Sequence, residues 1–223
     1  MQNYVKSSLV LVLGLILIFS GIYAYADDHS TLIRFAHLSP DAPAVDIWLD
    51  EGIVLEDVQF KTVSRYLELP TGSRQISITP ANETTPVVID ATVVFQENTA
   101  YTIAATGLIG EDDLKPLVLV DDHFVNVETT KVRFAHIAPD APAVDVGPDD
   151  GSVLFGDIEF REASDYAQLP ADTYDLEVRV AGTMDVALSV PDVTLEEGTN
   201  YTIFAIGTLE DGTLAALPIV DES

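Results

Sequence analysis

The chain has 223 residues, and its 37 acidic against 10 basic side chains give a formal net charge of −27 at pH 7. Because this charge repels polyanions and no Lys/Arg cluster offsets it, we expect no nucleic-acid partner. The lack of cysteine excludes disulfides, thiolate metal sites, thiol nucleophiles and a cysteine-linked lipid anchor. Three explanations of the acidity stay open, namely solubility of an exported protein, adaptation to high salt, or attraction of cations such as Ca²⁺.

The first 26 residues have the pattern of an export signal. Lys6 supplies a positive charge, residues 9–19 are apolar, and the tripeptide AYA at 24–26 matches the small-x-small site of signal peptidase. We therefore predict a signal helix over 1–26 that is removed before Asp27, and a protein that is periplasmic, secreted or on the cell surface. The alternative is an uncleaved anchor, because the apolar run nearly spans a bilayer of about 30 Å. Membrane contact is expected only in that case.

The mature chain is a tandem repeat. The stretch RFAHLSPDAPAVD at 34–46 returns as RFAHIAPDAPAVD at 133–145. Further matched pairs are Gly52/Gly151, Phe60/Phe160, Tyr66/Tyr166, Leu69-Pro70/Leu169-Pro170, Tyr101/Tyr201, Gly107/Gly207 and Val120-Asp121/Val220-Asp221. We predict two domains, 27–126 and 127–223. Since each copy is longer than a solenoid unit of about 20–50 residues, each should have a core of its own and fold alone.

Within each copy the apolar residues alternate as they do in β-strands. Ile76 and Ile78 alternate with polar residues, as do Tyr101, Ile103 and Ala105, whereas helical stripes are missing. About seven such strands in each copy, separated by Gly- and Asp-rich turns, predict an all-β protein of two immunoglobulin-like or transthyretin-like β-sandwiches. The run before Tyr201 and its counterpart before Tyr101 resemble a tyrosine corner.

The second copy departs from the first at Gly147-Pro148, which stand in place of Trp48-Leu49. Proline has no amide hydrogen to give to a β-ladder. We therefore expect the strand that holds Pro148 to end early or to lie at a sheet edge.

Three motifs together resemble a known prokaryotic family. They are RFAHLSPDAPAVDIWLD at 34–50, YLELPTG at 66–72 and YTIAATG at 101–107. The family is the domain of unknown function 4397 (DUF4397), and the resemblance covers nearly all of 31–122 and 130–223. It implies an exported, often tandem β-domain, and it supplies no established activity or functional residues.

The repeated signature suits a rigid structural corner. Pro40 and Pro43 bend the chain after an extended strand, and Asp41 between them can accept hydrogen bonds from backbone amides. His37 and His136 are then half-buried scaffold residues, each bonded to a nearby carboxylate or carbonyl. This interpretation accounts for every residue that the two copies retain.

The alternative is a functional site around the same histidines. His37 would pair with Asp41 or Asp46, and His136 with Asp140 or Asp145, as a general base or a metal site. A zinc site needs about three or four ligands, and each copy offers one repeated histidine. Since the motifs of hydrolases and of phosphate-binding loops are missing as well, we expect no catalysis and no catalytic residues.

Two other features suggest ligands. Ca²⁺ is the one candidate ion, and its weak candidate ligands are adjacent aspartates in turns, which serve equally well as solvated turn residues. They are Asp112, Asp113, Asp121, Asp122, Asp149 and Asp150. Trp48, the single tryptophan, can offer a platform for a sugar if it faces outward, or else cover a sheet edge or pack on the second copy.

The sequence thus predicts an exported, non-catalytic protein that acts as a binding, adhesion or envelope-structural module. Its partner would be an envelope or extracellular protein or a glycan, and no cofactor other than calcium is in view. The alternative is a calcium- or carbohydrate-binding protein, and behind it a hydrolase using His37 and His136.

Overall fold

The computed structural model describes residues 30–123 and 129–221, and every regular element in these two ranges is a β-strand. The predicted all-β class is therefore confirmed. The described ranges contain no helix that could cross a membrane. The predicted signal helix over 1–26 and the predicted boundary between residues 126 and 127 lie outside the described residues.

The first copy consists of eight strands in two four-stranded sheets. The strands are β1 (Ser30–His37), β2 (Val45–Leu49), β3 (Gly52–Val58), β4 (Leu67–Pro70), β5 (Gly72–Pro80), β6 (Ile89–Phe95), β7 (Ala100–Thr106) and β8 (Lys115–Asp121). One sheet has the order β4-β1-β7-β8 and the other the order β3-β2-β5-β6. Strands β1 and β7 run parallel, whereas the other neighbours are antiparallel.

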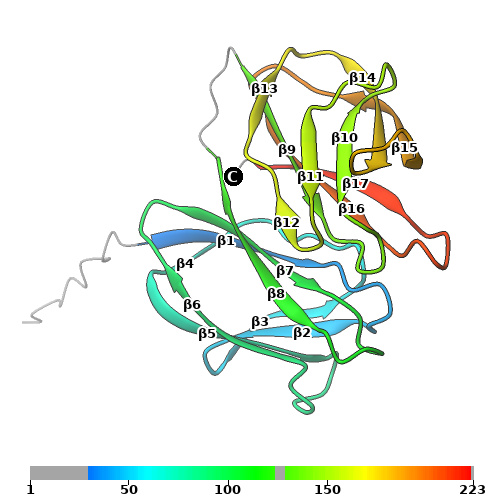
Figure 1. Cartoon of the computed structure of the whole chain (residues 1–223). Helices are drawn as coiled ribbons and strands as arrows, with labels where there is room; N and C mark the ends of the chain where they lie inside the picture. Colours follow the sequence, from blue (N-terminus) through cyan, green and yellow to red (C-terminus); the bar gives the residue numbers. More distant parts are fainter. Residues whose placement is uncertain (1–29, 124–128, 222–223) are drawn as a thin grey trace, which may run out of the picture.

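The second copy repeats this arrangement with nine strands. They are β9 (Thr130–His136), β10 (Val144–Pro148), β11 (Phe155–Ile158), β12 (Glu162–Ala163), β13 (Ala167–Leu169), β14 (Thr173–Val180), β15 (Val186–Thr194), β16 (Asn200–Ile206) and β17 (Ala215–Val220). The sheet orders are β12-β9-β16-β17, with β13 also paired to β9, and β11-β10-β14-β15. Strands β9 and β16 are parallel, as β1 and β7 are. Figure 1 shows the two copies as two bodies that lie against each other.

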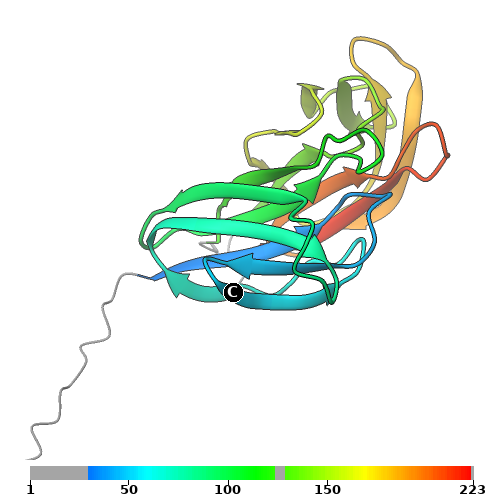
Figure 2. The same cartoon turned by 90° about the horizontal axis from the view of Figure 1, so that it is seen from below.

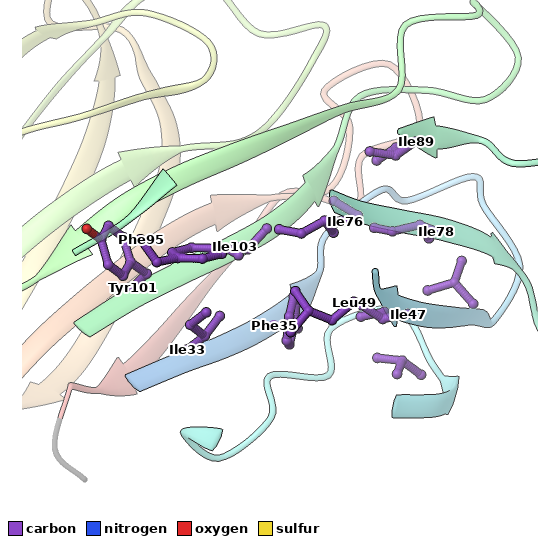
Figure 3. Close-up of a cluster of buried hydrophobic side chains, with 13 residues drawn as sticks. Ile33, Phe35, Ile47, Leu49, Ile76, Ile78, Ile89, Phe95, Tyr101 and Ile103 are labelled. Carbon is purple, nitrogen blue, oxygen red and sulfur yellow. The ribbon is translucent and has the colours of Figure 1, made fainter. Parts of the chain in front are cut away.

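Each copy has its own apolar core between its two sheets. In the first copy, Phe35 of β1 and Ile103 of β7 meet Ile47 of β2 and Ile76 of β5 (Figure 3). The predicted alternation is confirmed here, because these side chains point inward and their neighbours point outward. Complete burial of such a side chain contributes about 1.5–3 kcal/mol. The second copy builds the equivalent core around Phe134.

A third apolar cluster joins the two copies. It lies between the outer face of the β4-β1-β7-β8 sheet and the outer face of the β12-β9-β16-β17 sheet, which lie side by side in Figures 1 and 2. Its buried members are Ala36, Leu38, Ala104, Leu119, Ala135, Ile137, Phe204 and Ile206. All positions of β7 and β16 are consequently buried on both faces. Thr102 and Thr106, which the alternation would place in solvent, lie in the contact between the copies.

The tyrosines near the start of β7 and β16 make the contact expected of a tyrosine corner. The backbone N–H of Gln96 donates to the hydroxyl of Tyr101 at 3.2 Å, and Glu196 donates to Tyr201 at the same distance. Each phenol thus ties its strand to the chain five residues earlier.

The expectation for Pro148 is wrong. Strand β10 has the same five-residue length as β2 and lies inside its sheet, between β11 and β14. Its neighbour is shortened instead, since β11 has four residues where β3 has seven, and its pairing with β10 extends only to Val146. Because Pro148 lies beyond that pairing, its missing amide hydrogen removes no bond to β11.

The third cluster predicts that the copies stay together when the connection between them is cut. A protease site inserted between Val125 and Asn126 of the full chain should give a nicked protein that elutes as one species in size-exclusion chromatography, because dissociation would expose the buried apolar face. Separate elution of the two fragments under native conditions would contradict this interface.

Candidate functional site

The repeated histidines are buried at the ends of β1 and β9 and bond to the backbone of the bend that follows. The Nε2 atom of His37 lies 2.9 Å from the carbonyl oxygen of Pro43, and that of His136 lies 3.0 Å from the carbonyl oxygen of Pro142. The backbone N–H of Ala138 donates to Nδ1 of His136 at 3.3 Å, which makes Nε2 the protonated nitrogen. Of the two predicted partners, a carboxylate or a carbonyl, the carbonyl is confirmed in both copies, whereas the expected half-burial is wrong because both rings are fully buried.

Burial also decides the charge of these rings. Both histidines are almost completely inaccessible, and burial lowers the pKa of each below its ordinary value, against the opposing effect of the carbonyl contact. Their aromatic neighbours are Phe60 and Phe160, which meet the rings edge to face. A neutral, enclosed imidazole is poorly placed to exchange protons with a substrate.

The aspartate between the two prolines binds a distant loop. The carboxylate of Asp41 accepts hydrogen bonds from the backbone N–H groups of Ile109 and Gly110, both at 2.9 Å. In the second copy Asp140 accepts from Leu209 and Glu210 at 2.8 Å. Asp41 therefore accepts backbone hydrogen bonds as predicted, but it fastens the bend to the loop between β7 and β8.

The aspartate that ends the signature holds a bulge of the neighbouring strand and a turn at once. Asp46 accepts from the backbone N–H groups of Asp57 and Asn82 at 2.8 Å. Both of those residues, Asp57 at a bulge of β3 and Asn82 in a turn, have a positive φ, which is the left-handed region that non-glycine residues seldom adopt. Asp145 repeats these contacts with Asp157 and Gly182, and the bonds hold the pKa of its carboxyl below the ordinary value.

Arg34, the first residue of the signature, crosses from the first copy to the second. Its Nε donates to the hydroxyl of Thr102 at 2.8 Å within its own sheet, and its Nη1 donates to the carbonyl oxygen of Val220 at 2.6 Å. Its Nη2 forms an ion pair with Asp221. Both charged groups are buried.

Arg133 makes the reciprocal contact in the opposite direction. It donates to Thr202 at 2.8 Å, to the carbonyl oxygen of Val120 at 2.7 Å, and to the carboxylate of Asp121. Each copy thus presents an arginine to the other copy's aspartate. Contacts that exchange in this way define an isologous interface with approximate two-fold symmetry.

Two tyrosines complete this polar cluster. The hydroxyl of Tyr66 donates to Asp121 at 2.6 Å and that of Tyr166 donates to Asp221 at 2.7 Å. Burial raises the pKa of both phenols, which keeps them protonated as donors. The guanidinium groups of Arg34 and Arg133 lie 4.7 Å from the centroids of the Tyr66 and Tyr166 rings, within the range of a cation–π contact. We call these four pairs of Arg, Asp, Tyr and Thr residues the crossed cluster.

The model of one protein family matches both copies. The family is described as "Domain of unknown function (DUF4397)", and the matched residues are 31–147 and 130–223. The chain belongs to the DUF4397 family. This confirms the resemblance that the three sequence motifs indicated.

Other comparisons add nothing to the family's description. No curated protein matches the chain. Among solved structures, a leucine-rich repeat protein from Bacteroides thetaiotaomicron matches with a TM-score of 0.23 and 12% identity, over 81% of this chain and 26% of that one. The chain spans about a quarter of that protein's length, and the low TM-score carries no argument about fold or function.

The six aspartates considered for calcium lie at separate places in the two DUF4397 copies. Asp121 belongs to the crossed cluster, Asp122 pairs with Lys131, and Asp150 accepts from the backbone N–H of Ser152 at 2.8 Å. Asp113 pairs with Lys115 and with Arg161 of the second copy. Asp112 and Asp149 are exposed turn residues. Within 30–123 and 129–221 no three His, Cys, Asp or Glu side chains gather as metal ligands.

Arg161 gives the interface an asymmetric end. Its Nε donates to the hydroxyl of Thr106 at 2.9 Å, and its guanidinium pairs with Asp113 at 2.9 Å. The corresponding side chain of the first copy, Lys61, lies over the ring of Phe60 as Arg161 lies over that of Phe160, but only Arg161 also pairs with an aspartate of the other copy among the described residues. A cavity of about 480 Å³ remains between the copies at that end, bordered by Lys61 and Asp211.

Trp48 faces outward from β2, on the sheet that points away from the second copy. Its indole N–H donates to the hydroxyl of Thr79 at 3.1 Å, and its half-buried ring borders a hollow of about 200 Å³. Trp48 thus faces outward and does not pack on the second copy, whereas its use as a platform for a sugar stays a prediction. Sequence reasoning missed the crossed cluster, although its four charged residues, two arginines and two aspartates, all stood at matched positions of the repeat.

Removing one charge from the crossed cluster should strongly destabilise the protein. Arg34→Met leaves Asp221 buried without its cation, and we expect a loss of about 3–5 kcal/mol in the free energy of unfolding. Chemical denaturation monitored by circular dichroism measures this loss. The matched control is Lys115→Ala, which removes an exposed ion pair and should cost about 0–1 kcal/mol. Equal effects of the two substitutions would contradict the role assigned to Arg34.

Replacing the buried histidine should destabilise either copy. His37→Ala or His136→Ala leaves the carbonyl of the bend without a donor, which costs about 1–3 kcal/mol. His37→Gln places an amide near the position of Nε2 and should recover part of the loss. Unchanged stability in both alanine variants would remove the scaffold role.

The same variants predict a pH dependence. Burial lowers the pKa of both histidines in the folded chain, so the unfolded chain binds protons more readily below about pH 6.5. The stabilisation by the neutral rings is complete above that pH and is lost as the pH falls. The stability difference between the wild type and the double His→Gln variant should therefore shrink on acidification.

Proposed function

We propose that this DUF4397 protein is exported and acts without catalysis as a binding, adhesion or envelope-structural module in the periplasm or at the cell surface. The observation that carries the proposal is the use of the signature. Its Arg, His and two Asp side chains are bonded to backbone groups or buried partners in both copies. What the chain repeats is a scaffold, and a scaffold of this kind presents surfaces.

The finer fold that we propose for each copy is an immunoglobulin-like or transthyretin-like β-sandwich. Two features support it. The first strand of each copy pairs in parallel with the strand that opens on a corner tyrosine, and the two sheets face each other across one core. Such sandwiches serve widely as surface modules, and this analogy concerns architecture alone.

The export signal supports the location. The chain has no cysteine, so its folding does not depend on disulfide formation in any compartment. Its many acidic side chains favour solubility after export. Calcium binding stays a second candidate function, because the net negative charge of the chain attracts cations. Its expected mark is a rise in melting temperature with millimolar Ca²⁺ that equimolar Mg²⁺ does not reproduce.

The proposal is tested by expressing the full chain in a bacterial host. The protein released from the periplasm or medium should begin at Asp27 on N-terminal sequencing, and it should bind purified cell envelopes saturably in a sedimentation assay. Heat-denatured protein is the control for adsorption. A product that begins at Met1 in the cytoplasm, or a hydrolytic activity that disappears in His37→Gln, would overturn the proposal.

A further inference from the structure

The two copies differ at the outer sheet, which carries Trp48 in the first copy and Gly147 in the second. The register places Ile53, Trp48, Ser77 and Asp90 in one row across β3, β2, β5 and β6. Residues in one row of a sheet point to the same face, which here is the face turned away from the second copy. The row therefore runs from an apolar edge, over an indole, to a hydroxyl and a carboxylate.

The indole is fixed in place before any ligand arrives. Its N–H is committed to the hydroxyl of Thr79, which in turn donates to the carbonyl oxygen of Glu83 at 2.8 Å. What the indole can offer a ligand is therefore the exposed part of its ring. A ring held in this way loses little side-chain freedom on binding, which favours affinity.

Polar groups beside the ring suit a ligand with several hydroxyls. Gln75 and Ser77 both donate to Oδ1 of Asp90, at 2.8 and 3.5 Å, and Oδ2 of Asp90 accepts no hydrogen bond from the described residues. Asp50, Ser77 and Thr84 border the hollow beside Trp48. Acceptors and donors thus lie next to an apolar ring face.

The second copy closes the same position. Gly147 stands in place of Trp48, and the buried Arg179 lies against it, donating to the carbonyl oxygens of Pro148 and Ser152 at 2.9 and 2.5 Å. A Cβ atom at Gly147 would lie 2.0 Å from the Ser152 oxygen, so no side chain fits there. The open platform belongs to the first copy alone.

We propose that this platform, formed by Trp48, Ser77, Thr84 and Asp90, binds a neutral pyranose unit of a polysaccharide. The apolar face of a sugar ring would lie on the indole, and its hydroxyls would bond to Asp90 and Ser77. The hollow of about 200 Å³ is smaller than a pocket for a drug-sized ligand, about 300–1,000 Å³, and suits one ring. The surrounding carboxylates disfavour anionic ligands and nucleic acid. The proposal rests on the proposed binding function and names its ligand class.

The chain carries its own reporter for this site, because Trp48 is the only tryptophan. The full protein is titrated with a panel of neutral cello-, xylo-, malto- and chito-oligosaccharides while its tryptophan fluorescence is recorded. We expect a saturable change in intensity or wavelength with at least one of these sugars. If none of them at millimolar concentration changes the emission, the proposal is wrong.

Variants separate stacking from hydrogen bonding, and calorimetry measures their affinity because Trp48→Ala has no tryptophan signal. Trp48→Ala should weaken binding by about tenfold or more, whereas Trp48→Phe should retain part of it. Asp90→Asn should also weaken binding, and its second-copy counterpart Ser189→Ala should not. Unaltered binding in a folded Trp48→Ala protein would overturn the site. If that variant still binds envelopes, the proposed module stands without this ligand.

Discussion

The exchange of buried charges between the two copies constrains the rest of the molecule. The buried guanidinium of Arg34 needs the carboxylate of Asp221, which follows the last strand, as its ion-pair partner. Arg133 needs Asp121 in the same way. Breaking either pair leaves a charge in a place that water does not reach, which is far more costly than losing an exposed ion pair. The relative position of the copies is therefore specified by residues at their terminal strands, beyond the general attraction of apolar faces.

This constraint explains why the signature at 34–46 is repeated at 133–145. Along β1 the side chains serve two contacts in alternation, because Phe35 enters the core of its own copy while Arg34 and Ala36 face the other copy. The bend that follows is fixed by His37 and Asp41, so the strand ends at a defined place. A substitution within the signature therefore disturbs a core, a corner or the interface, and few residue types satisfy all three.

The sequence predicted the strands and the repeat. It could not predict the contact between the two copies, for physical reasons. Alternation predicted the strands around Ile76 and Ile103, because one face of each is apolar and inward. The burial of Thr102 and Thr106 could not be predicted in that way, since it arises from a partner sheet and not from the strand's own pattern. Pro148 misled for a similar reason. The strand that is shortened is its neighbour β11, and the position of the proline in β10 does not predict the length of a neighbouring strand.

Because the two copies belong to one chain, their interface need not be symmetric, whereas the interface of a dimer of identical chains must be. In such a dimer every substitution at the interface occurs twice, so a guanidinium that suits one end must suit the other. Here Arg161 donates to Thr106 of the first copy, whereas its counterpart Lys61 borders a cavity between the copies. Ala104 and Phe204 differ in size at equivalent positions of one apolar cluster. Because the two copies are encoded separately in one chain, a residue of the interface can change in one copy while its counterpart in the other copy stays the same.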